Sequence, residues 1–221
     1  MSHFRLIIFD LDGTLVDSFP GIRLGLNLAL DEFGRPPVDL AWVRRHVGLG
    51  ARRLIAAAAG DGVGTDDLMA RFRHHYDEVL CENSPPFPGT EEVLRELARN
   101  HTLAVASNKP IHWVEKLVAH HGWMPLMAAV EGPERAGAHK PDPSMVAKIL
   151  ATTGYDTTEA ILVGDMPVDA ETGRRAGVSV IGISTGAATA ETLREAGCLK
   201  VLENISELPR LLERGFKHGK I

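Results

Sequence analysis

The sequence predicts an α/β protein: a Rossmann-like, doubly wound parallel sheet with an inserted all-α domain. Short apolar runs alternate with helical patterns over residues 103–214, and this order places helices on both faces of a parallel sheet. A first strand is expected over residues 4–10. It is followed by residues 17–86, which show helical patterns and no convincing strand. We therefore expect a core domain of residues 1–16 and 87–221 and an inserted domain of residues 17–86.

Four helices are predicted in the inserted domain, with glycines between them. In the first, Ile22, Leu26 and Ala29 form a helical stripe, but Leu24 and Leu28 add a strand-like alternation, so the choice of helix rests partly on length. A proline-rich stretch closes the domain and is interpreted as a hinge. The helices are expected at residues 21–33, 40–47, 51–59 and 66–80, and the hinge at residues 85–89.

The core domain is predicted to alternate strands and helices after the first strand. Gly122 and Gly177 mark helix ends, and Asp142-Pro143 opens a helix. Because ligands of such sheets bind beyond the carboxyl ends of the strands, the inserted domain is expected to lie above the site. Strands are expected at 103–106, 126–130, 161–163 and 178–183, and helices at 110–121, 143–153, 167–176, 190–196 and 206–214.

Composition limits the possible partners and compartments. The chain has 221 residues, 44% of them hydrophobic, and a net charge of −5 without a basic block, which argues against binding nucleic acid or an anionic membrane. It has 2 cysteines and no CxxC motif, so no disulfide framework is expected. Neither a signal-peptide pattern nor a membrane-length apolar run occurs, which predicts a cytoplasmic protein.

The stretch from Phe9 to Ser18 is the most informative part of the chain. Leu11 separates Asp10 from Asp12, so in an extended strand both carboxylates point to one side. Two such charges repel by roughly 3 kcal/mol at an effective dielectric constant of about 20, which suggests a missing cation, a shared proton, or both. A plain Asp-Gly turn is the alternative, and for that dipeptide alone it is the favoured one.

Three further polar stretches follow predicted strands or open predicted helices. Ser107 and Asn108 follow one strand, where either a helix cap or an anion site is expected. Lys140 lies between His139 and Pro141 in a loop stiffened by prolines, and the alternative for it is a solvated lysine. Asp165 and Asp169 follow another strand, where acids at a helix N-terminus are the simpler interpretation.

Taken together, the four stretches resemble the four motifs of the haloacid dehalogenase superfamily, in its phosphatase branch. The resemblance runs from Phe4 to the final helices. It implies that Asp10 is the nucleophile and Asp12 the general acid/base. The dehalogenases of the superfamily lack an acid at the second position, so Asp12 points to phosphoryl chemistry. Thr14 and Ser107 are implied to bind the phosphoryl group. Asn108 is implied to lie beside it, and Lys140 to neutralise the nucleophile and phosphate.

The same resemblance implies a magnesium site. Mg²⁺ would be held by Asp10, the backbone carbonyl of Asp12, and Asp165, with Asp169 supporting the site directly or through water. These four acids and a phosphate ester outweigh the single positive charge of Lys140, so a hard divalent cation is needed. None of the ten histidines has metal-ligand spacing with these acids, and the pairs His74-His75 and His120-His121 are expected on helix faces.

The inserted domain resembles the small helical cap of the phosphoglycolate phosphatase and β-phosphoglucomutase subgroup. Residues 47–54 resemble a Val-Gly-x-Gly segment of phosphoglycolate phosphatases, although Leu49 stands where a polar residue is usual. On this basis Gly48 is a candidate substrate-binding residue. Either Arg52 or Arg53 is a candidate for holding a substrate carboxylate. The alternative is that both arginines are simply solvated.

The sequence therefore predicts a magnesium-dependent phosphatase that hydrolyses a small phosphorylated metabolite through an aspartyl-phosphate, with 2-phosphoglycolate as the preferred substrate. Inorganic pyrophosphate, a sugar phosphate or a β-phosphoglucomutase-like reaction are alternatives within the same chemistry. A non-catalytic phosphate-ligand sensor is a remote alternative. A sensor is expected to have lost the nucleophile or the acid, whereas Asp10 and Asp12 are both present.

Overall fold

The core of the computed structural model, which describes residues 4–60 and 63–214, is a six-stranded sheet in which every pairing is parallel. The strand order is β3-β2-β1-β4-β5-β6, which is the doubly wound order and confirms the predicted fold class. The chain reverses direction across the sheet between β1 and β4. The strands are β1 (Leu6–Phe9), β2 (Thr102–Ala106), β3 (Met127–Glu131), β4 (Ala160–Gly164), β5 (Ser179–Ile183) and β6 (Lys200–Leu202).

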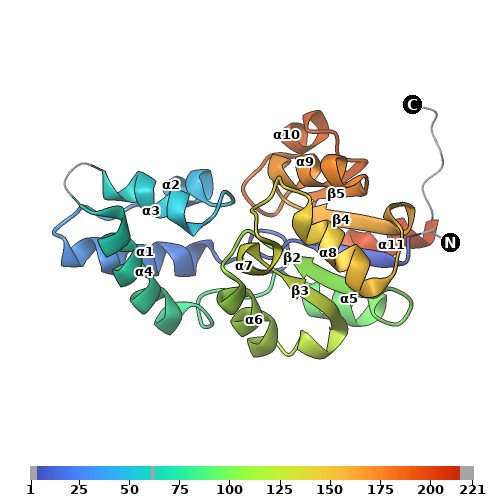
Figure 1. The fold of residues 1–221 in the computed structure, drawn as a ribbon, viewed down its shortest axis with the longest axis horizontal. Coiled ribbons are helices and arrows are strands. Elements are labelled where there is room, and N and C mark those ends of the chain that lie inside the picture. Colours follow the sequence, from blue (N-terminus) through green and yellow to red (C-terminus); the bar gives the residue numbers. More distant parts are fainter. Residues whose placement is uncertain (1–3, 61–62, 215–221) are drawn as a thin grey trace.

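Both faces of the sheet are covered because alternate residues of each strand point to opposite sides. Ile7 and Phe9 pack with the buried faces of α5, α6 and α11, whereas Leu6 and Ile8 pack with that of α8. The core helices surround the sheet in Figure 1. They are α5 (Thr90–Leu97), α6 (Ile111–His120), α7 (Pro133–Ala136), α8 (Ser144–Thr153), α9 (Pro167–Ala176), α10 (Ala190–Glu195) and α11 (Leu208–Arg214), with 3-10 turns at Met124–Leu126, Thr157–Glu159 and Ile205–Glu207.

The inserted helices form a separate group beside the sheet (Figure 1). In the first of them Ile22 and Leu26 are buried while Leu24 and Leu28 are exposed, which confirms a helix over a strand. We call this group the cap. Its helices are α1 (Phe19–Glu32), α2 (Leu40–His46), α3 (Ala51–Ala59) and α4 (Thr65–Val79).

Two chain segments connect the cap to the core, and they lie side by side. The amide of Asp17 donates to the carbonyl of Pro85 at 2.9 Å, and the amide of Phe87 donates to the carbonyl of Leu15 at 3.0 Å. Such a paired crossing is the arrangement expected of a hinge at residues 85–89. The boundaries of the two domains stay a prediction.

Besides the four-residue α7 and the 3-10 turns at Met124–Leu126 and Thr157–Glu159, two elements were not predicted. The helix α5 is amphipathic, with Val93, Leu94 and Leu97 buried, but it directly follows the proline-rich stretch that was interpreted as a hinge. The strand β6 has three residues at the edge of the sheet and begins with the exposed Lys200, so it lacks an apolar run long enough to signal a strand. The helix expected at 206–214 is a 3-10 turn followed by the shorter α11.

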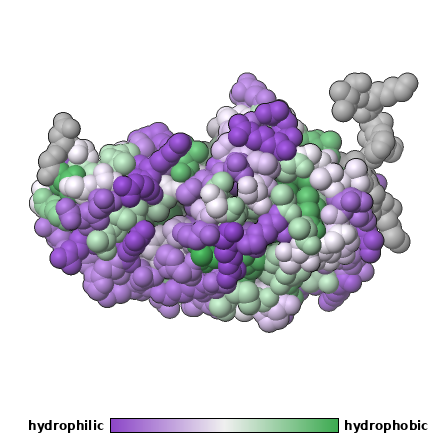
Figure 2. All heavy atoms as spheres, in the orientation of Figure 1, coloured by the Kyte–Doolittle hydropathy of each residue, from purple (hydrophilic) through white to green (hydrophobic). Residues whose placement is uncertain are grey.

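On the face shown in Figure 2 the cap is mostly hydrophilic, whereas hydrophilic and hydrophobic residues are mixed over the core. Large exposed apolar side chains such as Leu49 and Leu199 are distant in the sequence and belong to different domains. Over the described part of the chain, no helix is both long and apolar enough to cross a membrane.

Candidate active site

The site lies where three neighbouring strands end. Asp10 follows β1, Ser107 follows β2 and Asp165 follows β4. Phe9 pairs with Val105 on one side and Val163 on the other, so the three polar residues leave the sheet at the same level. Their position is the switch point of the sheet, between β1 and β4, where doubly wound folds bind ligands.

Lys140 joins the acid that follows β1 to an acid in the first turn of α9. Its Nζ lies 2.9 Å from Asp10 Oδ2 and 2.6 Å from Asp169 Oδ1, and all three side chains are buried. The side chain of Asn108 holds the Lys140 backbone by accepting from its amide at 2.6 Å and donating to its carbonyl at 3.0 Å. The structure thus brings Lys140 to the predicted nucleophile, across a sequence separation of more than a hundred residues.

Three buried carboxylates face this single lysine. One oxygen from each of Asp10, Asp165 and Asp169 lies within 4.8 Å of the others. Burial raises the pKa of Asp10 to about 6, against the opposing charge of Lys140. Burial, together with the charges of Asp10 and Asp169, also raises the pKa of Asp165 well above its usual range. The excess of negative charge and the all-oxygen donor set fit a hard divalent cation.

Local contacts fix the orientation of Asp165. Thr14 Oγ1 donates to its Oδ1 at 3.2 Å, and the amide of Ala187 donates to its Oδ2 at 2.9 Å. Gly13 has a φ of +83° and lies against the same carboxylate, where a β-carbon would come within 2.4 Å of Oδ2. The turn after Asp12 therefore needs glycine for both its backbone angle and its space.

Asp12 has a partner that the sequence reasoning missed. Lys109 Nζ lies 3.0 Å from Asp12 Oδ1 and 3.1 Å from Oδ2, and it donates to the Tyr76 hydroxyl at 2.7 Å. Lys109 directly follows the predicted Ser107-Asn108 pair. It therefore follows a strand whose end lies at the same edge of the sheet as Asp10 and Asp12, and this was a signal that could have identified it.

A pocket opens between the core and the cap above these residues. The core contributes the predicted residues Asp10, Asp12, Ser107 and Asn108, together with Lys109. The other walls are largely apolar, and their side chains include Phe19, Ile22, Leu54, Phe72 and Trp113. The predicted residue Gly48 also lines the pocket, and its carbonyl accepts from Asn108 Nδ2 at 2.9 Å.

The structure does not bring Arg52 to this pocket. Its guanidinium pairs with Asp66 at 2.8 Å, and 73% of the side chain is exposed. Arg52 and Arg53 instead line a second hollow with His139, Lys140 and Pro141, and Gly50 lines both hollows. The carboxylate-binding role of these arginines stays a prediction.

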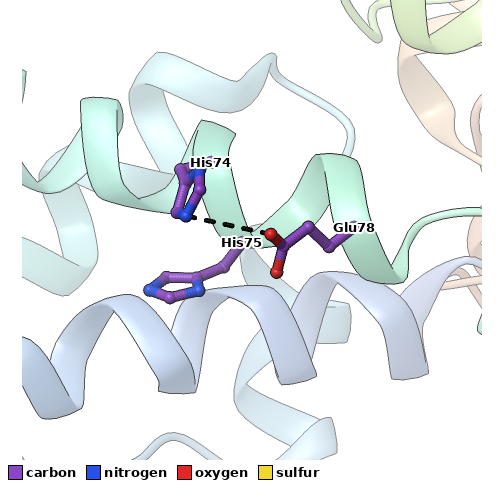
Figure 3. A group of neighbouring side chains, drawn as sticks. All are labelled: His74, His75 and Glu78. Atoms are coloured by element: carbon purple, nitrogen blue, oxygen red, sulfur yellow. Dashed lines mark ion pairs between the residues drawn. The ribbon is translucent and has the colours of Figure 1, made fainter.

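A second cluster of possible metal ligands lies on α4, where His74, His75 and Glu78 come together (Figure 3). His75 Nε2 lies 2.6 Å from Glu32 Oε1 of α1, and His74 Nε2 lies 3.9 Å from Glu78 Oε1. His74 and Glu78 are mainly exposed. The first contact joins α4 to α1, and the second is a contact between residues four apart within α4.

Comparison with known proteins agrees with this geometry. The family described as haloacid dehalogenase-like hydrolase matches residues 7–183. The chain belongs to this family. Within the haloacid dehalogenase-like hydrolases, a phosphoglycolate phosphatase of Rhodospirillum rubrum is 35% identical over 92% of this chain and 89% of its own length. A phosphoglycolate phosphatase of Caulobacter vibrioides is 36% identical over the same shares.

A solved structure leads to the same family. The crystal structure of a predicted phosphoglycolate phosphatase from Haemophilus somnus superposes with a TM-score of 0.89 at 27% identity, covering 95% of this chain and 98% of that one. The sequence resemblance to a haloacid dehalogenase-like phosphatase is thus confirmed, and the chain is an enzyme of the phosphoric monoester hydrolase type.

Proposed function

We propose that this haloacid dehalogenase-like hydrolase is a magnesium-dependent phosphatase with 2-phosphoglycolate as its substrate. The observation that carries the proposal is the buried Asp10–Lys140 pair, in which Asp10 lines the same pocket as Asp12. A nucleophilic carboxylate, a fixed cation and a second carboxylate beside it are the groups that phosphoryl transfer through an aspartyl-phosphate requires. The phosphoglycolate phosphatases among the relatives support this choice of substrate.

In the proposed reaction, Asp10 attacks the phosphorus of the ester in line with the leaving group, and a phosphoaspartate forms. Lys140, which lies 2.9 Å from Asp10, carries the positive charge that keeps this buried carboxylate available as a nucleophile. Thr14, Ser107 and Asn108 are proposed to contact the oxygens of the phosphoryl group as charge redistributes in the transition state.

Asp12 is proposed to handle the protons of both steps. As an acid it donates a proton to the departing alkoxide, and as a base it then takes a proton from the water that hydrolyses the phosphoaspartate. Its position on the pocket wall beside Asp10 suits both roles.

The trio of Asp10, Asp165 and Asp169 is the proposed magnesium site, with the backbone carbonyl of Asp12 as a further ligand. Bound there, Mg²⁺ would supply positive charge to the phosphate oxygens. One oxygen of each acid lies within 4.8 Å of the others, and Lys140 is the only cation paired with them among the described residues, so the residues present fit such an ion.

The substrate is tested by a hydrolysis screen of small phosphate compounds with Mg²⁺. The panel is 2-phosphoglycolate, inorganic pyrophosphate, several sugar phosphates and p-nitrophenyl phosphate. The proposal expects the highest kcat/KM for 2-phosphoglycolate, and loss of all activity in Asp10→Asn. A higher kcat/KM for pyrophosphate or a sugar phosphate would replace the substrate while keeping the chemistry. Absence of hydrolysis of every compound would overturn the proposed function.

A further inference from the structure

Three side chains in hydrogen-bond contact connect the cap to Asp12, the proposed acid/base. Tyr76 comes from α4 of the cap, Lys109 from the loop after β2, and Asp12 from the loop after β1. Lys109 Nζ donates to Tyr76 at 2.7 Å and to both Asp12 oxygens at 3.0 and 3.1 Å. The lysine side chain is 3% exposed and that of Asp12 is 13% exposed. Nothing in the catalytic scheme uses Tyr76 or Lys109.

Of these three side chains, Lys109 is the one that holds the Asp12 carboxylate. Among the hydrogen bonds of residues 4–60 and 63–214, the Asp12 carboxylate accepts from Lys109 alone. An ammonium group has three N–H donors, and the acceptors around Lys109 Nζ are the two Asp12 oxygens and the Tyr76 hydroxyl. A buried donor that loses its partner is costly, so the tyrosine hydroxyl restricts where the ammonium can lie.

The tyrosine itself is held by packing across the same interface. Its ring contacts the Trp113 ring of α6 edge-on, with the ring centroids 4.8 Å apart, and stacks on the Phe72 ring of α4, with the centroids 5.0 Å apart. Trp113 Nε1 in turn donates to Asp77 of α4 at 2.6 Å. These contacts fix the Tyr76 hydroxyl relative to the core when the cap lies in the position seen here.

We propose that Lys109 and Tyr76 are positioning residues that hold the Asp12 carboxylate in place, and that cap closure acts on the acid/base through them. The inference rests on the proposed phosphatase function. The contacts of Lys109 Nζ with Asp12 at 3.0 and 3.1 Å and with Tyr76 at 2.7 Å hold the lysine head group between these two side chains. A cap displaced from the core loses the Tyr76 contact and with it the restraint on Asp12.

The test separates the two proton transfers from substrate binding. An alkyl ester such as 2-phosphoglycolate needs a proton on its leaving group, whereas p-nitrophenyl phosphate does not, and both need Asp12 to activate water. Lys109→Met is expected to lower kcat for 2-phosphoglycolate by roughly a hundredfold, within the range typical of general acid–base catalysis, with KM little changed. With p-nitrophenyl phosphate it is expected to give a rapid burst of one nitrophenol per enzyme before slow turnover.

Tyr76→Phe removes only the hydroxyl and preserves the ring packing. It is expected to show the same burst, with kcat for 2-phosphoglycolate lower by roughly tenfold. Lys109→Arg is expected to recover part of the loss. The matched controls are Tyr155→Phe, which removes the hydroxyl bonded to Thr102, and Lys148→Met, which removes a surface lysine paired with Glu131. Both controls are expected to keep wild-type kinetics with both esters.

The positioning role would be overturned if Lys109→Met raised KM at an unchanged kcat, because that would make Lys109 a substrate ligand. It would also be overturned if, with p-nitrophenyl phosphate, a folded variant released the first nitrophenol as slowly as it turned over in the steady state. Thermal unfolding of each variant shows that it is folded. A wild type that hydrolyses neither ester would overturn the proposed function and this inference with it. An active wild type whose variants lack the burst would overturn the inference alone.

Discussion

Gly13 lies directly against Asp165, and a β-carbon built at Gly13 would fall 2.4 Å from Asp165 Oδ2. The contact joins the turn after the acid/base to the acid at the end of β4. These two residues are far apart in the sequence, and strand β1 lies next to β4 in the sheet. A glycine that looks like part of an ordinary Asp-Gly turn therefore sets the position of a proposed metal ligand.

Gly13→Ala should accordingly lower both the activity and the stability of the protein. The backbone angle alone should cost about 1–2 kcal/mol of unfolding free energy, and displacement of Asp165 should lower kcat by roughly a hundredfold. Gly154→Ala is the matched control, because Gly154 has a similar φ of +75° but no atom within 4 Å of its β-carbon position. It should lose stability and keep its kcat. Equal kinetics in the two variants would refute the contact's role.

Asp10 should make the metal-free protein less stable as pH rises. Burial raises its pKa from 3.8 to about 6, so between these values the folded state binds more protons than the unfolded chain. Its contribution to stability is therefore full below pH ~4 and lost as pH rises through ~6. Asparagine does not titrate. The unfolding free energy of Asp10→Asn, relative to wild type, should thus rise by about 3 kcal/mol between pH ~4 and ~7.

Denaturant unfolding of both proteins in EDTA across this pH range measures that difference. The comparison between wild type and variant cancels the titration of shared groups that do not interact with Asp10. The pKa of Asp165, which the charge of Asp10 raises, falls in the variant, and this change adds to the same difference. A difference that stays flat, or that falls as pH rises, would show that burial does not raise the pKa of Asp10.

Magnesium should offset the negative charges of Asp10, Asp165 and Asp169 and so stabilise the folded protein without substrate. At a free concentration of about 100 times its Kd, the ion should add about 2.7 kcal/mol to the unfolding free energy. Asp165→Asn should remove most of this gain, whereas Asp66→Asn, on the exposed surface of the cap, should keep it. The measurement is thermal unfolding with and without Mg²⁺. Equal stabilisation of the two variants would place the ion elsewhere.

Arg52 should contribute little to substrate selection, contrary to the role that the sequence suggested for it. Its guanidinium is exposed and paired with Asp66, outside the pocket that Asp10 lines. We expect Arg52→Ala to change kcat/KM by no more than about twofold for 2-phosphoglycolate and p-nitrophenyl phosphate. A ten- to hundredfold loss confined to 2-phosphoglycolate would restore Arg52 as the carboxylate ligand.

The core of the candidate site could be predicted because each of its residues lies just after a strand or in a distinctive loop. The carboxyl ends of parallel strands meet at one edge, so Asp10, Ser107 and Asp165 had to converge once the sheet was predicted. Lys140 was identifiable through its proline-flanked loop and its resemblance to a family motif.

The link between cap and core could not be predicted in the same way. Tyr76 and Lys109 are 33 residues apart and lie in different domains, and no local pattern joins them. The packing of α4 against α6, through Phe72 and Trp113, determines that they meet. For the same reason Arg52 was a reasonable candidate from its position at a helix start, because its pairing with Asp66 depends on how α3 and α4 pack.

The central claim is that Asp10 forms the covalent intermediate, and trapping that intermediate tests it most directly. The enzyme would be mixed with phosphate-labelled p-nitrophenyl phosphate and Mg²⁺, quenched in acid within the first turnovers and digested. The labelled residue would then be identified by mass spectrometry. We predict label on Asp10 in the wild type, more of it in Lys109→Met because its hydrolysis is slowed, and none in Asp10→Asn. Label on Ser107 or on a histidine would contradict this mechanism.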